Sequence, residues 1–184
     1  MVTARILIAD DEELFLDATA ELLRQDGHTI DVAPDAASAM EQIRSATYDA
    51  LIADIKMPGN ARLEFVHALE EEAPHLPIIL VTGYPSLETA MESVNLNVMA
   101  YLTKPIDMET LSQHVDAALA KSRTTTLMER MKDRAQQRIQ LIDQVESSSV
   151  DSPSSLLEPL FEMAFQDVAE AYIDLRQLFA VMEQ

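Results

Sequence analysis

Short apolar runs alternate with helically spaced segments over the first 120 residues. Five runs have the length of strands, and most are apolar at consecutive positions: 5–9, 29–33, 50–53, 78–81 and 99–102. Such runs are typical of parallel strands that are covered on both faces. The segments between them repeat apolar residues at helical steps, as in Leu14, Ala18 and Leu22. This order predicts an α/β fold with a five-stranded, doubly wound parallel sheet, whose functional site lies at the carboxyl ends of its strands.

The pattern after residue 120 is helical only. No glycine follows Gly83, and no proline lies between Pro105 and Pro153, so one long helix is predicted there. A serine-rich break over 147–155 precedes a second predicted helix over 155–183. That helix carries an apolar heptad stripe, formed by Leu157, Phe161, Ala164, Val168, Ala171, Leu175, Leu178 and Met182. We therefore predict two domains, an α/β domain over 1–120 and an α-helical hairpin extension over 121–184.

The apolar face of the extension is wider than a two-helix hairpin can bury, because Leu160, Phe165, Tyr172 and Phe179 lie beside the stripe. We expect residues 121–184 to form a homodimeric helical bundle. Two other outcomes stay open, namely packing against the first domain of the same chain and binding of a downstream protein partner.

The charge balance narrows the classes of partner. The chain carries 32 acidic against 13 Lys and Arg residues, for a net charge of −19, which disfavours binding to nucleic acid. The basic run 121–138 also contains acids and an apolar stripe, so a solvated bundle face explains it better than a phosphate contact.

The absence of cysteine excludes disulfides and thiolate chemistry. The sequence predicts neither a signal peptide nor a membrane span, and we expect a cytoplasmic protein.

Several residues whose side chains can bind a metal ion or catalyse a reaction lie at the ends of the predicted strands. Asp10 and Asp11 follow the first strand, Asp54 ends the third, Thr82 ends the fourth and Lys104 follows the fifth. Carboxylates brought together at one sheet edge repel one another unless a cation neutralises them. Oxygen-only ligands at an open edge suit Mg²⁺. A divalent ion beside an ammonium and a hydroxyl group is typical of sites that catalyse phosphoryl transfer.

Each of these residues has an ordinary structural interpretation when it is taken alone. Asp10 or Asp11 could cap a helix, Thr82 could belong to a turn, and Lys104–Pro105 could start a helix. The joint arrangement favours a functional site, because all of these residues fall at ends of predicted strands.

Four segments resemble the receiver domain of two-component response regulators, which is CheY-like and has a flavodoxin-like fold. They are ILIADDE at 6–12, DIKMPG at 54–59, VTGY at 81–84 and YLTKP at 101–105. The resemblance covers about residues 3–120. It implies that Asp54 is the phospho-acceptor, that Asp11 ligates Mg²⁺ directly, and that Asp10 does so directly or through water.

The same resemblance assigns the remaining site residues. The backbone carbonyl of Lys56 would be a further Mg²⁺ ligand, and Lys104, before a cis-proline, would pair with the phosphoryl oxygens. Thr82 would hydrogen-bond to the phosphoryl group, and Tyr101 would turn inward with it as the second residue of the switch. The stretch before the fifth strand, 95–100, lacks a glycine that the family often has there.

We therefore expect a two-component response regulator that accepts a phosphoryl group from a sensor histidine kinase. It would catalyse only its own phosphorylation and dephosphorylation, and would not be an enzyme for other substrates. Its phosphorylation state would be transmitted through protein–protein contacts made by residues 121–184. The alternative is a transcriptional regulator with an unrecognised small DNA-binding output. No histidine follows His114, which excludes a phosphotransfer-histidine domain in the extension.

Overall fold

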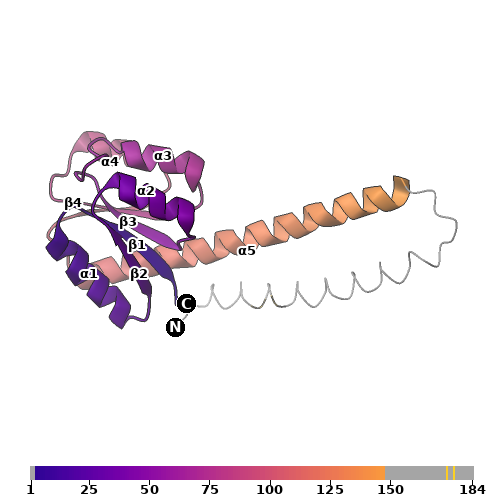
Figure 1. Cartoon of the computed structure of the whole chain (residues 1–184), viewed down its shortest axis with the longest axis horizontal. Helices are drawn as coiled ribbons and strands as arrows, with labels where there is room; N and C mark the ends of the chain where they lie inside the picture. The colour runs from indigo at the N-terminus through magenta and orange to yellow at the C-terminus, as the bar shows by residue number, and fades with distance from the viewer. Residues whose placement is uncertain (1–2, 148–172, 174–175, 177–184) are drawn as a thin grey trace. The chain divides into compact units, whose positions relative to one another are not determined.

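A computed structural model of the chain describes residues 3–147 together with residues 173 and 176 (Figure 1). The chain divides into two compact units, Met1–Ser122 and Arg123–Gln184. The second helix predicted for the extension, over 155–183, lies outside the described residues except for Ile173 and Arg176, which are both helical. Its apolar stripe and its role in a dimer stay predictions.

Five parallel strands form one sheet in the order β2-β1-β3-β4-β5. The strands are β1 Arg5–Ala9, β2 Thr29–Ala33, β3 Ala50–Asp54, β4 Ile78–Thr82 and β5 Val98–Thr103. The helices are α1 Glu13–Gln25, α2 Ala36–Ser45, α3 Glu64–Glu72, α4 Leu87–Ser93 and α5 Met108–Ser147. This architecture confirms the predicted doubly wound, flavodoxin-like sheet. The strand order reverses at β1 and β3, so ligands are expected at the carboxyl ends of these two strands.

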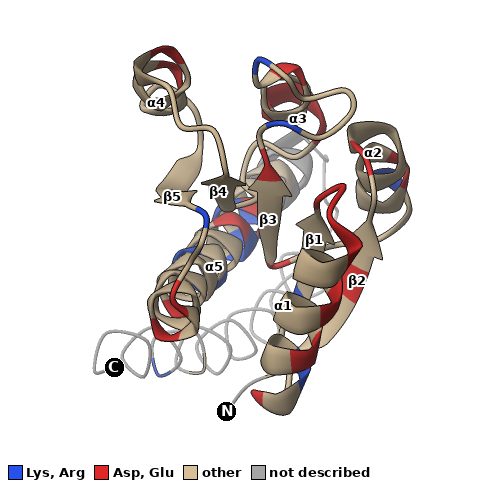
Figure 2. Cartoon of the chain, turned by 90° about the vertical axis from the view of Figure 1, so that its left-hand side faces the viewer, with Lys and Arg blue, Asp and Glu red and all other residues tan. Residues whose placement is uncertain are grey.

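Helices cover both faces of the sheet, with α2 and α3 on one side and α1 and the first turns of α5 on the other (Figure 2). Neighbouring residues of each strand enter opposite cores. Leu7, Leu51 and Leu80 pack toward α2 and α3, whereas Ile8 and Ile52 pack toward α1 and α5. Since each fully buried aliphatic side chain contributes roughly 1.5–3 kcal/mol, these two layers fix the strand register that brings the site together.

The extension begins as an uninterrupted continuation of α5, which is a single helix of 40 residues. In the first half of the extension, Leu127 is buried, whereas the apolar residues Met131 and Ile139 are exposed. Within the described part of the chain, no helix is both long and apolar enough to cross a membrane.

Candidate functional site

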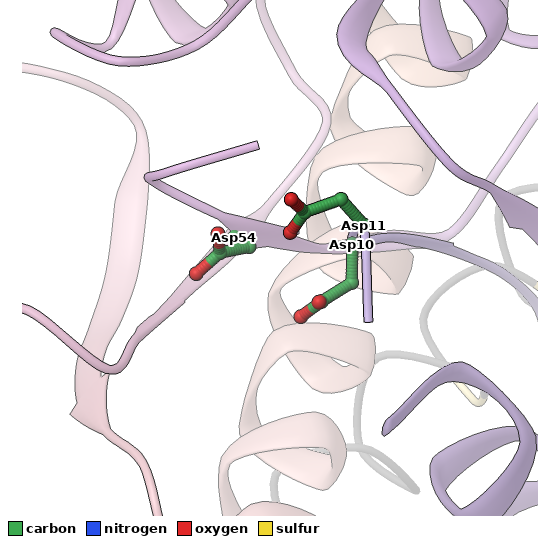
Figure 3. A group of neighbouring side chains, drawn as sticks. All are labelled: Asp10, Asp11 and Asp54. Carbon is green, nitrogen blue, oxygen red and sulfur yellow. The ribbon is translucent and has the colours of Figure 1, made fainter. Parts of the chain in front are cut away.

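Three carboxylates meet at the carboxyl edge of the sheet (Figure 3). Asp10 and Asp11 directly follow β1, and Asp54 is the last residue of β3, the neighbouring strand. One oxygen of each carboxylate lies within 4.8 Å of the others. Asp10 and Asp54 are buried, and Asp11 is exposed. The cluster is therefore open to solvent on the side of Asp11.

Backbone amides hold the two buried carboxylates. Asp10 Oδ1 accepts a hydrogen bond of 2.9 Å from the Glu12 N–H, and Asp54 Oδ2 accepts one of 2.8 Å from the Lys56 N–H. Burial raises the pKa of Asp10. Burial likewise raises the pKa of Asp54, where the charges of Asp10 and Asp11 add to the rise and Lys104 partly offsets it. Both shifts come chiefly from burial, and at Asp54 repulsion by Asp10 and Asp11 adds to it; a bound cation would favour the charged form of both carboxylates.

Lys104 supplies the positive charge of the site. Its ammonium nitrogen lies 2.7 Å from Asp10 Oδ2, 2.7 Å from Glu12 Oε1 and 3.9 Å from Asp54 Oδ1. It also lies 4.4 Å from the centre of the Phe15 ring, a cation–π contact. Burial by itself would lower the pKa of Lys104, but the bonds to Asp10 and Glu12 outweigh it and raise this pKa. The ammonium is consequently charged at neutral pH. The peptide bond between Lys104 and Pro105 is cis, as the resemblance implies.

The donor set of this cluster fits a hard divalent cation such as Mg²⁺. All its side-chain ligand atoms are carboxylate oxygens, and one edge is solvated, as this ion requires because it retains several waters. Asp10 Oδ2 is buried and its partner is the Lys104 ammonium 2.7 Å away, so a cation bound at this oxygen would have to share it with the lysine.

Thr82 lies at the same edge, whereas Tyr101 lies two residues before the end of β5, opposite Leu80. Thr82 ends β4 and is fully buried, and its hydroxyl accepts a 3.1 Å hydrogen bond from the Tyr84 N–H. The Tyr101 hydroxyl lies 2.9 Å from Thr89 Oγ1 and accepts a hydrogen bond from the Ser86 N–H. In this structure the Tyr101 hydroxyl is thus bonded to the first turn of α4 and not to the carboxylates.

A family model described as "Response regulator receiver domain" matches residues 6–116. The chain belongs to the response regulator receiver family. The predicted resemblance over about residues 3–120 is confirmed.

Individual relatives agree with this membership of the receiver family. The transcriptional regulatory protein ZraR of Escherichia coli K12 is 33% identical over 118 residues, which cover 62% of this chain and 26% of ZraR. A CheY-like receiver domain protein from Methanospirillum hungatei JF-1 is 30% identical, covers 67% of this chain and 99% of its own, and gives a TM-score of 0.61. The beryllofluoride-activated NtrC4 receiver domain dimer is 25% identical, with 64% of this chain and 98% of the NtrC4 chain covered, and gives a TM-score of 0.60. The chain spans about a quarter of the length of ZraR.

The helix-cap interpretation of the receiver's acids is wrong. The N-cap of α1 is Glu12, whose side chain makes no capping hydrogen bond. The helix after Lys104–Pro105 begins only at Met108, where Asp107 accepts a hydrogen bond from the Thr110 N–H. Asp10 and Lys104 are therefore paired with each other across the sheet edge and do not serve as helix ends.

Sequence reasoning missed two polar residues of the receiver's site. Glu12 ends the ILIADDE segment, for which the sequence predicts no role at this position, yet it forms an ion pair with Lys104. The sequence predicts no role for Asn60, yet this residue is fully buried in the loop after β3 and donates a hydrogen bond to the carbonyl of Asp54. The available indication for Asn60 was its position six residues after Asp54, next to Gly59 in a loop.

Proposed function

We propose that this receiver accepts a phosphoryl group on Asp54 from the phosphohistidine of a sensor histidine kinase, with Mg²⁺ as cofactor. The observation that carries the proposal is the cluster of Asp10, Asp11 and Asp54 with the Lys104 ammonium 3.9 Å from Asp54 Oδ1. Membership of the receiver family supports it.

The proposed chemistry is an in-line transfer. An Asp54 carboxylate oxygen attacks the phosphorus of the donor, the phosphorus–nitrogen bond of the phosphohistidine breaks, and the electron pair stays on the imidazole nitrogen. The product is an acyl phosphate on Asp54. Asp10, Asp11, Asp54 and the Lys56 carbonyl would hold Mg²⁺, which neutralises the negative charge between acceptor and donor.

Lys104 and Thr82 would act on the transferred group. The ammonium needs to move only from its carboxylate partners toward Asp54 to pair with a phosphoryl oxygen. The Thr82 hydroxyl at the adjacent strand end would donate to another such oxygen. Tyr101 would then exchange its hydrogen bond with Thr89 for an inward position, which links the site to α4. Thr82 and Tyr101 together form the proposed switch.

Residues 121–184 are the proposed output, as a homodimer or as a docking segment for a downstream protein. The similar NtrC4 protein is described as a beryllofluoride-activated receiver domain dimer, which supports dimerisation of the receiver and does not bear on residues 121–184. A DNA-binding regulator is the second candidate, since ZraR is named a transcriptional regulatory protein. The similarity to ZraR covers 26% of its length, and the net charge of −19 disfavours contact with phosphate backbones.

The test is phosphorylation by a small donor. Purified chain is incubated with acetyl phosphate, with Mg²⁺ or with excess EDTA, and its intact mass is recorded. One phosphoryl group is expected with Mg²⁺ and none with EDTA or in Asp54→Ala. Asp35→Ala is the control, because Asp35 caps α2 outside the cluster. Labelling of Asp54→Ala, or labelling of the wild type in EDTA, would overturn the proposal.

A further inference from the structure

Asn60 joins the end of β3 to the first turn of α3. Its side chain is fully buried. Nδ2 donates a 2.8 Å hydrogen bond to the carbonyl of Asp54, and Oδ1 accepts one of 3.2 Å from the Phe65 N–H. Its backbone N–H donates to the Met57 carbonyl, and its carbonyl accepts from the Leu63 N–H. One residue thereby satisfies polar groups along the whole loop.

The loop that Asn60 organises also holds the Asp54 carboxylate. The Lys56 N–H donates to Asp54 Oδ2 at 2.8 Å. On the other side, the Ala36 N–H donates to the Pro58 carbonyl, and a Cβ at Gly59 would lie 2.9 Å from the Ala36 Cβ. The loop is therefore clamped between α2 and the Asn60 side chain, and its position determines where the Lys56 backbone sits.

We propose that Asn60 is a positioning residue for Mg²⁺ binding and phosphorylation at Asp54, acting through the Lys56 backbone. The inference rests on the proposed function of the site. Asn60 touches neither the carboxylate nor the reacting atoms, but it fixes the peptide that carries the acceptor and the amide that orients it. A primary amide offers a donor and an acceptor at once. Alanine offers neither, and it leaves the Asp54 carbonyl and the Phe65 N–H without these partners in a buried place.

Removing a residue that orients metal ligands from the second layer typically costs 10–100-fold in metal affinity. We expect Asn60→Ala to bind Mg²⁺ about tenfold more weakly than the wild type, measured by calorimetric titration of the full chain. In the metal-free protein, the Lys56 amide should exchange with deuterium faster than in the wild type. Slower labelling by acetyl phosphate should accompany both changes.

Asn97→Ala is the matched control. Asn97 Nδ2 also donates to two backbone carbonyls, Leu76 at 2.8 Å and Pro74 at 3.3 Å, at the opposite edge of the sheet. This variant loses comparable hydrogen bonds but should keep the Mg²⁺ affinity and the Lys56 exchange rate of the wild type. An equal loss in Asn97→Ala would overturn the inference, because general destabilisation would then explain the effect.

Asn60→Ala with Mg²⁺ affinity within about twofold of the wild type would also overturn the inference while leaving the proposed function intact. A wild type that binds no Mg²⁺ and takes no phosphoryl group would instead overturn the proposed function, and this inference with it. Should circular dichroism show Asn60→Ala to be unfolded, Asn60→Ser decides. Weaker Mg²⁺ binding by this variant supports the positioning role, and binding equal to that of the wild type refutes it.

Discussion

The Lys104 ammonium lies 3.9 Å from Asp54 Oδ1, beyond hydrogen-bond distance. It is held closer to Asp10 and Glu12, at 2.7 Å from an oxygen of each. A phosphoryl group on Asp54 would carry negative charge into the space that separates the two residues. We therefore propose that Lys104 reports phosphorylation by exchanging its carboxylate partners for a phosphoryl oxygen.

Lys104→Ala should still be phosphorylated by acetyl phosphate but should lose the response to it. A charge-assisted contact contributes roughly 1.5–3 kcal/mol, which is comparable with the gap of a few kcal/mol between two conformers. Sedimentation velocity before and after labelling measures the response. Arg44→Ala, which removes an exposed ion pair with Glu72, should behave as the wild type. A full phosphorylation-induced change in Lys104→Ala would exclude this lysine as the coupling residue.

A second charged contact links α3 to α4. His67 Nε2 lies 2.7 Å from Glu92 Oε1, and His67 Nδ1 lies 3.6 Å from Glu70 Oε2. The bond to Glu92 raises the pKa of His67 most. Burial, the next largest effect, lowers this pKa, and the bond to Glu70 adds a smaller rise. Because the folded state binds this proton more tightly, the added stability is fully present below about pH 6.5 and is lost as the pH rises through the raised pKa.

The free energy of unfolding in urea is measured for the wild type and for His67→Gln between about pH 6 and pH 9, and the difference between the two gives the contribution of the protonated His67. The side chain of His67 is 46% exposed, so solvent screening limits the expected difference to less than about 1 kcal/mol. The wild type should lose that increment relative to His67→Gln as the pH rises. His114→Gln serves as the histidine control. Parallel pH profiles for wild type and His67→Gln would contradict the prediction.

The fold could be predicted because most strands are marked by a run of consecutive apolar residues. The helices were predicted less precisely. The spacing that indicates α1 runs through Leu14, Ala18 and Leu22, yet Leu14 is 86% exposed and the buried residues are Leu16, Thr19, Ala20 and Leu23. Apolar residues occupy both faces of this helix, so periodicity could not determine which face meets the sheet.

The candidate site, like the fold, could be predicted from the sequence only in part. Asp10, Asp11, Asp54 and Lys104 could be placed together because parallel strands end at one edge. The contact of Tyr101 with Thr89 depends on how α4 lies against β5. The burial of Asn60 depends on how the loop after β3 folds back. These are tertiary relationships between residues that carry no shared pattern in the sequence.

The extension is predicted to associate through its apolar stripe, which lies outside the described residues. Replacing Leu175 and Leu178 by aspartate would place two charges in that seam and should abolish dimerisation. Each buried leucine would contribute roughly 1.5–3 kcal/mol. The control is Gln166→Asp with Gln177→Asp, which adds the same charge away from the stripe. A wild type that sediments as a monomer at high concentration would refute the dimer and leave the receiver or another protein as the partner of the stripe.

The central claim is that Asp54 alone receives the phosphoryl group. Borohydride reduces an acyl phosphate to the alcohol, so an aspartyl phosphate becomes homoserine, which peptide mass spectrometry locates by residue. After treatment with acetyl phosphate and Mg²⁺, homoserine is expected at position 54 only, and in EDTA at no position. Homoserine at Asp10 or Asp11, or its absence from Asp54 in the Mg²⁺ sample, would contradict the account.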